Sequence, residues 1–269
     1  MVRMRGMPSD TPQAKWPIEG RVALVTGAGA GGTGRAIALR LARGGAAVVV
    51  NDLDEDGGRT TVRLAEEGGG QAIFVRADVT TETDIERIVA VAERTFGGLD
   101  ILVNNAGGTP QPHFPEAARE HWGRTLDLNL RGPMLAIQEA LPSMRKRGGG
   151  AIVNISSVAG LGYAPHSSPE YSAAKAGLAR LTATLAPLQE RENVRVNCIV
   201  PNWIGTEEVL AEIAAMTPEE RAEVPDVLTS PEEIAELVVE LVEDSSLAGR
   251  VFVWWTGRAP EPMPIDSGN

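Results

Sequence analysis

Residues 21–45 read RVALVTGAGAGGTGRAIALRLARGG, an apolar run, a glycine-rich turn and a helical pattern in direct succession. The run from Val22 to Val25 is continuously apolar, which is typical of a strand covered on both faces. The helical part places Ile37 and Leu41 one turn apart and stops at a glycine pair. We therefore expect a buried strand that turns tightly into an amphipathic helix.

The same alternation continues along the chain. Further strands are predicted near residues 46, 71, 99, 150, 194 and 249, in AAVVVND, QAIFVRADV, LDILVNNAG, GAIVNISS, VRVNCIVP and GRVFVWW. Helical patterns lie between them, and two pairs have capping-box spacing: Thr83 with Glu86, and Ser230 with Glu233. This order predicts an α/β fold: a doubly wound (Rossmann) parallel sheet of about seven strands with helices on both faces.

The chain has 269 residues and 43% hydrophobic content, enough for the core of one large domain. No repeat or linker divides it. We expect a flexible N-terminal tail over residues 1–19, one folded Rossmann-type domain over 20–257, and an irregular, proline-rich tail over 258–269. The first residues lack the apolar stretch of a secretory signal.

Charge and cysteine usage exclude several classes of function. The formal net charge is −11 and no basic stripe is present, which disfavours nucleic acid and anionic membrane surfaces as partners. No apolar run approaches the roughly 20 residues of a membrane span. The single cysteine, Cys198, cannot form an internal disulfide and lies in an apolar segment, so a buried core residue and a cytoplasmic location are expected. We expect no metal site.

The glycine loop has the setting of a phosphate-binding turn. Glycines there let backbone N–H groups approach a pyrophosphate at a helix N-terminus, although glycine serves any tight strand–helix turn. The second strand ends at Asp52, 18 residues past Gly34. A carboxylate at that place can accept both adenosine ribose hydroxyls and repels a 2′-phosphate, so it favours NAD over NADP. The alternative is a solvated loop aspartate, since NDLDED contains three aspartates.

Tyr171 and Lys175 form a second unusual pattern. The chain has two tyrosines and three lysines, and random placement would give a Tyr-x-x-x-Lys about 0.02 times. On a helix the two side chains project from one face. An ammonium favours the phenolate, so Lys175 is expected to lower the Tyr171 pKa and make the phenol a usable proton acceptor. The alternative is that Tyr171 and Lys175 form an ordinary contact on an exposed helix face without a catalytic role.

Six motifs in order give a resemblance that covers residues 18–257. They are the glycine loop, DV at 78–79, NNAG at 104–107, LNLRG around Asn129, NISS ending at Ser157, and YSAAK at 171–175. Together they resemble the short-chain dehydrogenase/reductase family. The resemblance implies hydride transfer with NAD(P), a homotetramer or homodimer, and a catalytic tetrad of Asn129, Ser157, Tyr171 and Lys175.

Each tetrad residue takes a role from this resemblance. Tyr171 would exchange a proton with the substrate oxygen, Ser157 would hold that oxygen, Lys175 would grip the nicotinamide ribose, and Asn129 would anchor a proton-relaying water. Ser156 is the competing candidate for the catalytic serine. Neighbouring strand positions face opposite ways, so only one of the two serines can point toward the site, and the resemblance implies the second, Ser157. Asn129 could instead be a helix-packing amide. The resemblance also implies cofactor contacts from Gly27, Gly32, Thr33, Gly34, Asp52, Asp78, Val79, Asn105, Ala106, Gly107, Tyr171, Lys175, Ile204 and Thr206.

Three departures from the family pattern stand out. The glycine loop is one residue longer than TGxxxGxG, between Ala28 and Gly31. A 14-residue step separates Ser157 from Tyr171 and contains His166, either a substrate contact or a loop residue without a role. The last strand ends in Trp254 and Trp255, which should face opposite ways. The roles of these tryptophans and of Trp203 stay open.

We therefore expect an NAD-dependent oxidoreductase that interconverts a secondary alcohol and a ketone. The segment 206–231, a candidate substrate lid, is short and acidic, which disfavours polyanionic substrates. Two alternatives are kept: an NADPH-dependent ketone reductase, against which Asp52 argues, and a dinucleotide-binding regulator without turnover, against which the complete tetrad argues.

Overall fold

The computed structural model describes residues 15–109, 111–162, 166–222 and 224–264. Its centre is one sheet in the order β3-β2-β1-β4-β5-β6-β7-β8. The first seven strands are parallel. Their bounds are β1 Val22–Thr26, β2 Ala47–Asp52, β3 Gln71–Arg76, β4 Ile101–Asn104, β5 Gly150–Ile155, β6 Val194–Pro201 and β7 Val251–Trp254. The expected doubly wound α/β fold is confirmed, with eight strands in place of about seven.

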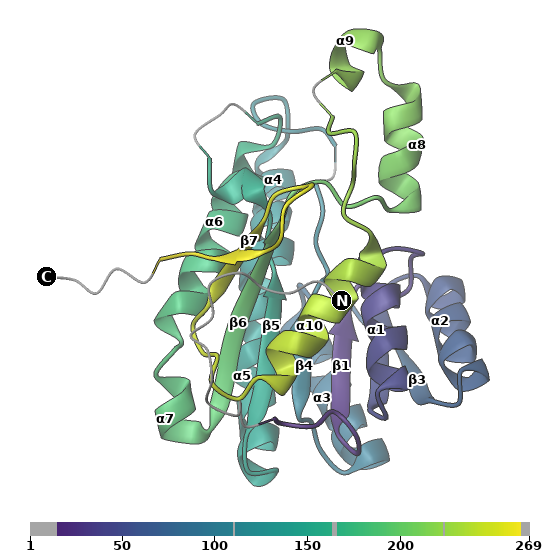
Figure 1. Ribbon diagram of the computed structural model, residues 1–269, viewed down its shortest axis with the longest axis vertical. Coiled ribbons are helices and arrows are strands. Elements are labelled where there is room, and N and C mark those ends of the chain that lie inside the picture. Colours follow the sequence, from purple (N-terminus) through teal and green to yellow (C-terminus); the bar gives the residue numbers. More distant parts are fainter. Residues whose placement is uncertain (1–14, 110, 163–165, 223, 265–269) are drawn as a thin grey trace, which may run out of the picture.

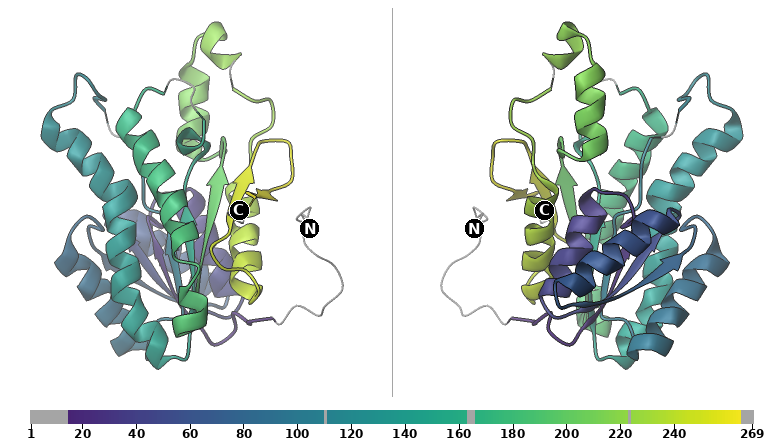
Figure 2. Two further views of the ribbon diagram at one scale, coloured as in Figure 1. Left: turned by 90° about the vertical axis from the view of Figure 1, so that its left-hand side faces the viewer. Right: turned by 90° about the vertical axis from the view of Figure 1, so that its right-hand side faces the viewer.

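Helices cover both faces of the sheet (Figures 1 and 2). One face carries α1 Thr33–Arg43, α2 Glu55–Glu67 and α10 Pro231–Glu243. The other carries α3 Glu82–Phe96, α5 Gly132–Lys146 and α6 Pro169–Thr184. The remaining helices are α4 Arg119–Leu126, a π-helical turn η1 Asp127–Arg131, a 3₁₀ turn η2 Val158–Gly160, α7 Leu188–Glu192, α8 Glu207–Ala215 and α9 Pro218–Arg221.

The sheet separates two apolar cores. Ala23 and Val25 of β1 lie in the core beneath α1 and α10, whereas Val22 and Leu24 lie in the core beneath α3 and α5. All four are buried, which explains why this strand reads as a continuous apolar run. Cys198 in β6 is also fully buried, and burial raises the pKa of its thiol to about 12.

The two capping patterns have different outcomes. Ser230 and Glu233 form the expected capping box at the start of α10. Thr83 does not cap α3, so that prediction was wrong. The Thr81 carbonyl accepts the N–H groups of Asp84 and Ile85, so the first turn closes two residues earlier and Thr83 lies inside the helix.

The N-terminal segment corrects the expected tail boundary. Residues 1–14 lie outside the described residues, but residues 15–19 pack against the domain. Ile18 is 2% exposed in the core, and the Trp16 N–H donates to the Glu243 carbonyl at 2.8 Å. The Trp16 ring lies 4.0 Å from the Arg21 guanidinium. These two apolar side chains hold the segment because leaving the sheet would expose them to water.

The C-terminal segment corrects the other boundary. β8, Glu261–Pro262, pairs antiparallel with β7 within the region expected to be irregular, and the Met263 N–H donates to the Val251 carbonyl at 2.7 Å. Proline is compatible with an edge strand, where its missing N–H is not needed. Residues 265–269 lie outside the described residues. Among the residues that the structure covers, no helix is both long and apolar enough to cross a membrane.

The strand order fixes where a ligand can bind. It reverses between β1 and β4, so the loops that follow these two strands lead to opposite sides and leave a crevice at their carboxyl ends. Helices α8 and α9 stand beyond that edge of the sheet, at the top of Figure 1.

Candidate active site

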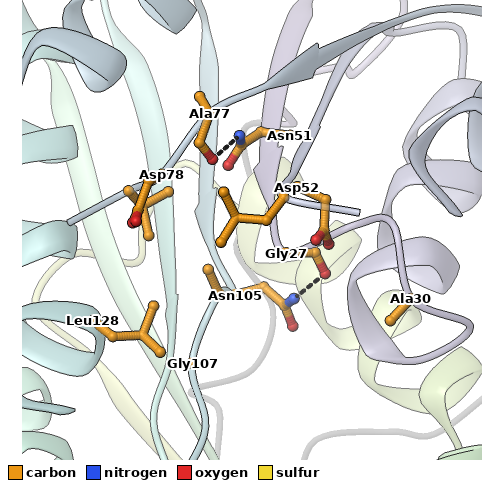
Figure 3. Close-up of a pocket in the computed structure, with 12 residues that line it drawn as sticks. Gly27, Ala30, Asn51, Asp52, Ala77, Asp78, Asn105, Gly107 and Leu128 are labelled. Atoms are coloured by element: carbon orange, nitrogen blue, oxygen red, sulfur yellow. Dashed lines mark hydrogen bonds between the residues drawn. The ribbon is translucent and has the colours of Figure 1, made fainter. Parts of the chain in front are cut away.

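A cavity of about 300 Å³ lies at the carboxyl ends of β1–β4. Figure 3 shows its lining. Seven lining residues are among the expected cofactor contacts: Gly27, Asp52, Asp78, Val79, Asn105, Ala106 and Gly107. The volume is at the lower end of the range for small-molecule sites, and the place is the switch point at which such folds bind ligands.

The glycine loop is packed too closely for side chains at Gly27, Gly29 and Gly34. Gly27 has φ +64, and a Cβ there would lie 2.8 Å from the Ala106 Cα. A Cβ on Gly34 would lie 2.1 Å from the Gly27 carbonyl oxygen. The Asn105 side chain donates to the carbonyls of Thr26 and Gly27 at 3.0 and 2.9 Å and so ties the loop to the end of β4. Gly27 and Gly34 are therefore required by space.

Asp52 lies at the end of β2 with both carboxylate oxygens held by backbone amides. Oδ2 accepts the Gly29 N–H at 2.7 Å, and Oδ1 accepts the Asp54 N–H at 3.0 Å. Each oxygen keeps a lone pair, because a carboxylate can accept about four hydrogen bonds. The residue faces the cavity and has the acceptor capacity for two ribose hydroxyls.

Asp78 and Val79 line the cavity beyond β3. The Asp78 carboxylate accepts the Thr80 N–H at 2.9 Å and the Thr80 hydroxyl at 2.7 Å, and its other oxygen lies 3.7 Å from Arg124 Nη2. These bonds hold the carboxylate at the wall of the cavity.

The remaining expected cofactor residues are not in the cavity lining. Gly32 and Thr33 lie at the start of α1, and Gly34 is packed against the Gly27 carbonyl. Thr206 caps α8 by accepting the Val209 N–H at 3.3 Å, and its methyl group lies 3.4 Å from where a Gly32 Cβ would be. Ile204 packs partly buried against the core.

Gly107 connects the cavity to the expected catalytic group. A Cβ on Gly107 would lie 2.8 Å from Asn129 Oδ1 and 3.0 Å from Lys175 Nζ. Asn129 is fully buried in η1, accepts the Gly108 N–H at 3.1 Å and donates to the carbonyls of Gly108 and Thr125, each at 2.9 Å. Its two hydrogen bonds with Gly108 therefore fix the turn through which the cavity meets the expected catalytic group.

Lys175 is 3% exposed and its Nζ donates to the Ile155 carbonyl at 2.9 Å. Burial lowers the pKa of its ammonium from 10.5 to about 8. Nζ lies 5.5 Å from the centroid of the Tyr171 ring, so the two side chains share one face of α6 as expected.

Tyr171 differs from the expectation in one respect. Burial raises the pKa of its phenol above 10.0, and a hydrogen bond with Ser157 lowers it only in part. The expectation that Lys175 lowers this pKa is wrong for the chain alone. The reason is that loss of water dominates, while the Lys175 ammonium is directed at Ile155.

The two serines at the end of β5 have separate environments. Ser156 is buried and its hydroxyl donates to the Lys175 carbonyl at 2.7 Å. Ser157 is half-buried, accepts the Ala159 N–H at 3.2 Å and contacts Tyr171. The contact with the phenol favours Ser157 as the site residue.

His166 stacks on Tyr171, with ring centroids 5.9 Å apart and planes at 23°. Its Nδ1 accepts the Ser168 N–H at 3.0 Å. The neighbouring residues 163–165 lie outside the described residues. Trp254 is 4% exposed and packs in the core, whereas Trp255 is 45% exposed, as alternation predicts. The Trp203 carbonyl accepts the Thr229 N–H at 3.1 Å.

Sequence reasoning missed several residues of this region. Asn51 and Leu53 flank Asp52 in the cavity wall, and their position beside the acid was the available signal. Other missed lining residues are Ala30, Ala77 and Leu128. Arg35 and Thr61 bind backbone carbonyls of the glycine loop. They gave no sequence signal, because their mutual hydrogen bond joins two different helices, α1 and α2.

Comparison with known proteins gives one consistent result. A family model described as short chain dehydrogenase matches residues 21–217. An oxidoreductase of Thermotoga maritima, described as uncharacterized, is 42% identical over 204 residues, 76% of this chain and 80% of the relative. The cis-4-hydroxycyclohexanecarboxylate dehydrogenase of Sinomonas cyclohexanicum is 40% identical over 235 residues, 84% of this chain and 90% of the relative.

A solved structure resembles the fold over most of its length. The 7α-hydroxysteroid dehydrogenase complexed with NADH and 7-oxo glycochenodeoxycholic acid superposes with a TM-score of 0.82 at 32% identity. The match covers 91% of this chain and 96% of that protein.

Proposed function

Because this chain belongs to the short-chain dehydrogenase/reductase family, whose members are oxidoreductases that use NAD(H) or NADP(H), we propose that it interconverts a secondary alcohol and a ketone with NAD. One observation supports this most directly. Gly107 lines the cavity and also abuts Asn129 and Lys175, so a dinucleotide in the cavity would end beside the face that bears Tyr171.

The chain's residues fit NAD. Gly27 and Gly34 form a cradle that a Cβ would fill, and Asp52 has two free acceptor positions for the adenosine ribose hydroxyls. Asp78 and Val79 would hold the adenine. The middle of the dinucleotide would lie beside Asn105, Ala106 and Gly107. Gly32 and Thr33 at the N-terminus of α1, together with Ile204 and Thr206, would complete the site. The bound nicotinamide ring would supply the hydride acceptor or donor.

Tyr171 is the proposed general acid and base. In alcohol oxidation its oxygen takes the hydroxyl proton as the carbinol carbon gives up a hydride, and in ketone reduction the proton returns to the carbonyl oxygen. Ser157, which hydrogen-bonds the Tyr171 phenol, would also hold the substrate oxygen by hydrogen bonding. Burial favours the phenol form of Tyr171, which suits proton donation to a ketone, so oxidation should accelerate as pH rises above neutrality.

Lys175 and Asn129 support the proton transfer. A pKa of about 8 allows the Lys175 ammonium to exchange a proton near physiological pH. Asn129 fixes the Gly107–Gly108 turn through two hydrogen bonds with the Gly108 backbone, and a third bond, to the Thr125 carbonyl, ties its side chain to α4. The water relay through Asn129 stays a prediction.

Two relatives indicate the substrate class. One is named for a hydroxyl on a cyclohexane ring, and the other was solved with a 7-oxo steroid. Both substrates carry the reacting oxygen on a secondary ring carbon. We propose a ring-borne secondary alcohol as the first class to test.

The test uses the wild-type protein in two steps. NADH and NADPH are titrated by protein fluorescence, and tighter NADH binding is expected. Cyclic and acyclic secondary alcohols are then offered with NAD⁺ while absorbance of NADH is followed. Tighter NADPH binding would contradict the NAD proposal, and NADH binding without turnover across the panel would favour the non-catalytic regulator.

We also propose a cytoplasmic homotetramer or homodimer. Large apolar side chains near and on α4 and α5 are exposed: Phe114, Trp122 and Met134 at 55%, 36% and 46%. Exposed apolar residues on neighbouring elements favour self-association. Light scattering after gel filtration is the check, and a monomer at micromolar concentration would contradict it.

A further inference from the structure

We propose that Arg35 and Thr61, here named the Arg35–Thr61 clamp, set the preference for NAD over NADP by holding Asp52 in place through Gly29. The proposal deepens the proposed function and rests on it. Neither residue lines the cavity described above, so both would act as positioning residues.

Arg35 binds the glycine loop from α1. Its Nη2 donates to the Gly29 carbonyl and, at 3.3 Å, to the Gly57 carbonyl. Its Nε donates to the Thr61 hydroxyl oxygen at 2.9 Å. The guanidinium therefore joins the glycine loop to the first turns of α2.

Thr61 completes the clamp from α2. It is fully buried, and its hydroxyl donates to the Ala28 carbonyl at 2.7 Å while it accepts from Arg35. The carbonyls of two successive loop residues, Ala28 and Gly29, are thus both bound by the clamp. A buried hydroxyl that both donates and accepts cannot be removed without leaving a partner unsatisfied.

Gly29 is the point where the clamp meets Asp52. Its N–H is bound by Asp52 at 2.7 Å and its carbonyl by Arg35, so both of its backbone torsions are constrained. Glycine would otherwise be the most mobile residue of the loop. No larger residue fits, because a Cβ on Gly29 would lie 2.8 Å from the Cβ and Cγ of Asp52. The beginning of the loop and the Asp52 carboxylate therefore form one rigid unit.

This rigidity matters for cofactor choice. A carboxylate excludes a 2′-phosphate only while it cannot turn away from it. A fixed carboxylate also binds the ribose hydroxyls without an ordering cost. Loosening the clamp should therefore weaken NADH binding strongly and NADPH binding little.

A direct charge effect of Arg35 predicts the opposite change in the preference for NADH over NADPH. If Arg35 acted as a positive charge toward a phosphate, its removal would weaken NADPH most and raise discrimination. The ratio of the two dissociation constants therefore distinguishes positioning from direct attraction.

The experiment measures that ratio in four variants. Arg35→Met removes the guanidinium, and Thr61→Val removes only the hydroxyl at similar volume. Thr61→Ser keeps the hydroxyl and should retain the wild-type ratio. Arg59→Met is the matched control, because Arg59 is an exposed arginine on α2 that pairs only with Glu55 in the bonds described for it.

For Arg35→Met we expect NADH to bind about 10-fold more weakly and NADPH about 2-fold more weakly, so discrimination falls about 5-fold. Thr61→Val should lower discrimination about 3-fold. At saturating NAD⁺ the kcat should stay within about 2-fold, because the Tyr171 region is untouched. Circular dichroism verifies folding, and Thr61→Val with Thr61→Ser decides the matter if Arg35→Met does not fold.

The proposal is overturned if the variants keep the wild-type ratio of the two dissociation constants, which includes equal weakening of NADH and NADPH binding. A rise in the preference for NADH would also overturn it. These outcomes are separate from failure of the proposed function. That failure appears in the wild type as tighter NADPH binding or absent turnover, before any variant is made.

Discussion

The cofactor region and the catalytic region of this chain are constrained by different forces. Around Gly27, Gly34 and Asp52, the backbone is packed so closely that side chains do not fit, and the acid is held by amide N–H groups. Around Tyr171 and Lys175, the side chains fit easily, but removal from water shifts both pKa values.

This difference separates what a substitution should do in each region. In the cofactor region, where space is limiting, an added side-chain atom must displace the backbone and should weaken dinucleotide binding. Where desolvation is limiting, a changed side chain should alter proton transfer and pH dependence while binding persists. The following predictions test this division, beginning with the largest effect.

Tyr171→Phe should lower alcohol oxidation about 10³-fold, because it removes the proton-accepting oxygen and keeps the ring. Its affinity for NADH should stay within about 2-fold. Steady-state turnover and fluorescence titration measure the two quantities on the same preparation. Retained turnover would show that another group is the base, and a large loss of NADH affinity would break the division between the regions.

Gly34→Ala should weaken NADH binding about 100-fold, since its Cβ would lie 2.1 Å from the Gly27 carbonyl oxygen and must displace the loop. Gly123→Ala is the control: its Cβ would meet nothing within 4 Å on helix α4. Calorimetric titration with NADH compares the two. Equal affinity in both variants would mean that the close approach of Gly34 to the Gly27 carbonyl does not limit binding.

Lys175→Met tests the desolvated ammonium through stability. The folded pKa of about 8 lies below 10.5, so the unfolded chain binds more protons between these values and the wild type gains stability as pH rises. From pH 7 to 9.5 the gain relative to Lys175→Met should be about 2 kcal/mol. Urea unfolding at both pH values measures it, because the shift of Tyr171 affects both proteins alike.

Lys146→Met is the control for that experiment, since its side chain is 73% exposed. It should show the same pH response as the wild type. A pH-independent difference between the wild type and Lys175→Met would show that the ammonium is not desolvated.

Asp52→Ala should lower the preference for NADH over NADPH about 10-fold, because the negative charge and two hydrogen-bond acceptors are lost. Parallel titrations with both dinucleotides give the ratio. Asp54→Ala is the companion variant: that acid caps α2 at an exposed site, so its loss should cost stability and leave the ratio unchanged. An unchanged ratio in Asp52→Ala would remove the basis for the NAD proposal.

The fold was largely predictable from local patterns. Apolar runs, helix periodicity and the glycine turn each depend on neighbours in sequence, so they specify strands, helices and their alternation. The errors came where tertiary contacts intervene. The segment that contains Trp16 and Ile18 was predicted to be a tail, but these two side chains pack against the core. The proline-rich segment forms β8 because β7 would otherwise be an unpaired edge of the sheet.

The site was predictable in part. Tyr171 and Lys175 lie on one helix face, a local property that their spacing fixes. The raised pKa of Tyr171 was not predictable, because burial depends on every element that surrounds the phenol. The stacking of His166 on Tyr171 likewise depends on how the loop returns to α6.

The sequence by itself therefore determined the order of strands and helices, the glycine turn and the residues that face one another on a single helix. Only the tertiary structure decided that Arg35 and Thr61 would bind the Ala28 and Gly29 carbonyls beside Asp52, and that Gly107 would join the cavity to the region of Lys175. The physical reason is distance along the chain: local periodicity fixes neighbours a few residues apart, whereas steric exclusion and desolvation arise only when remote segments close around one another.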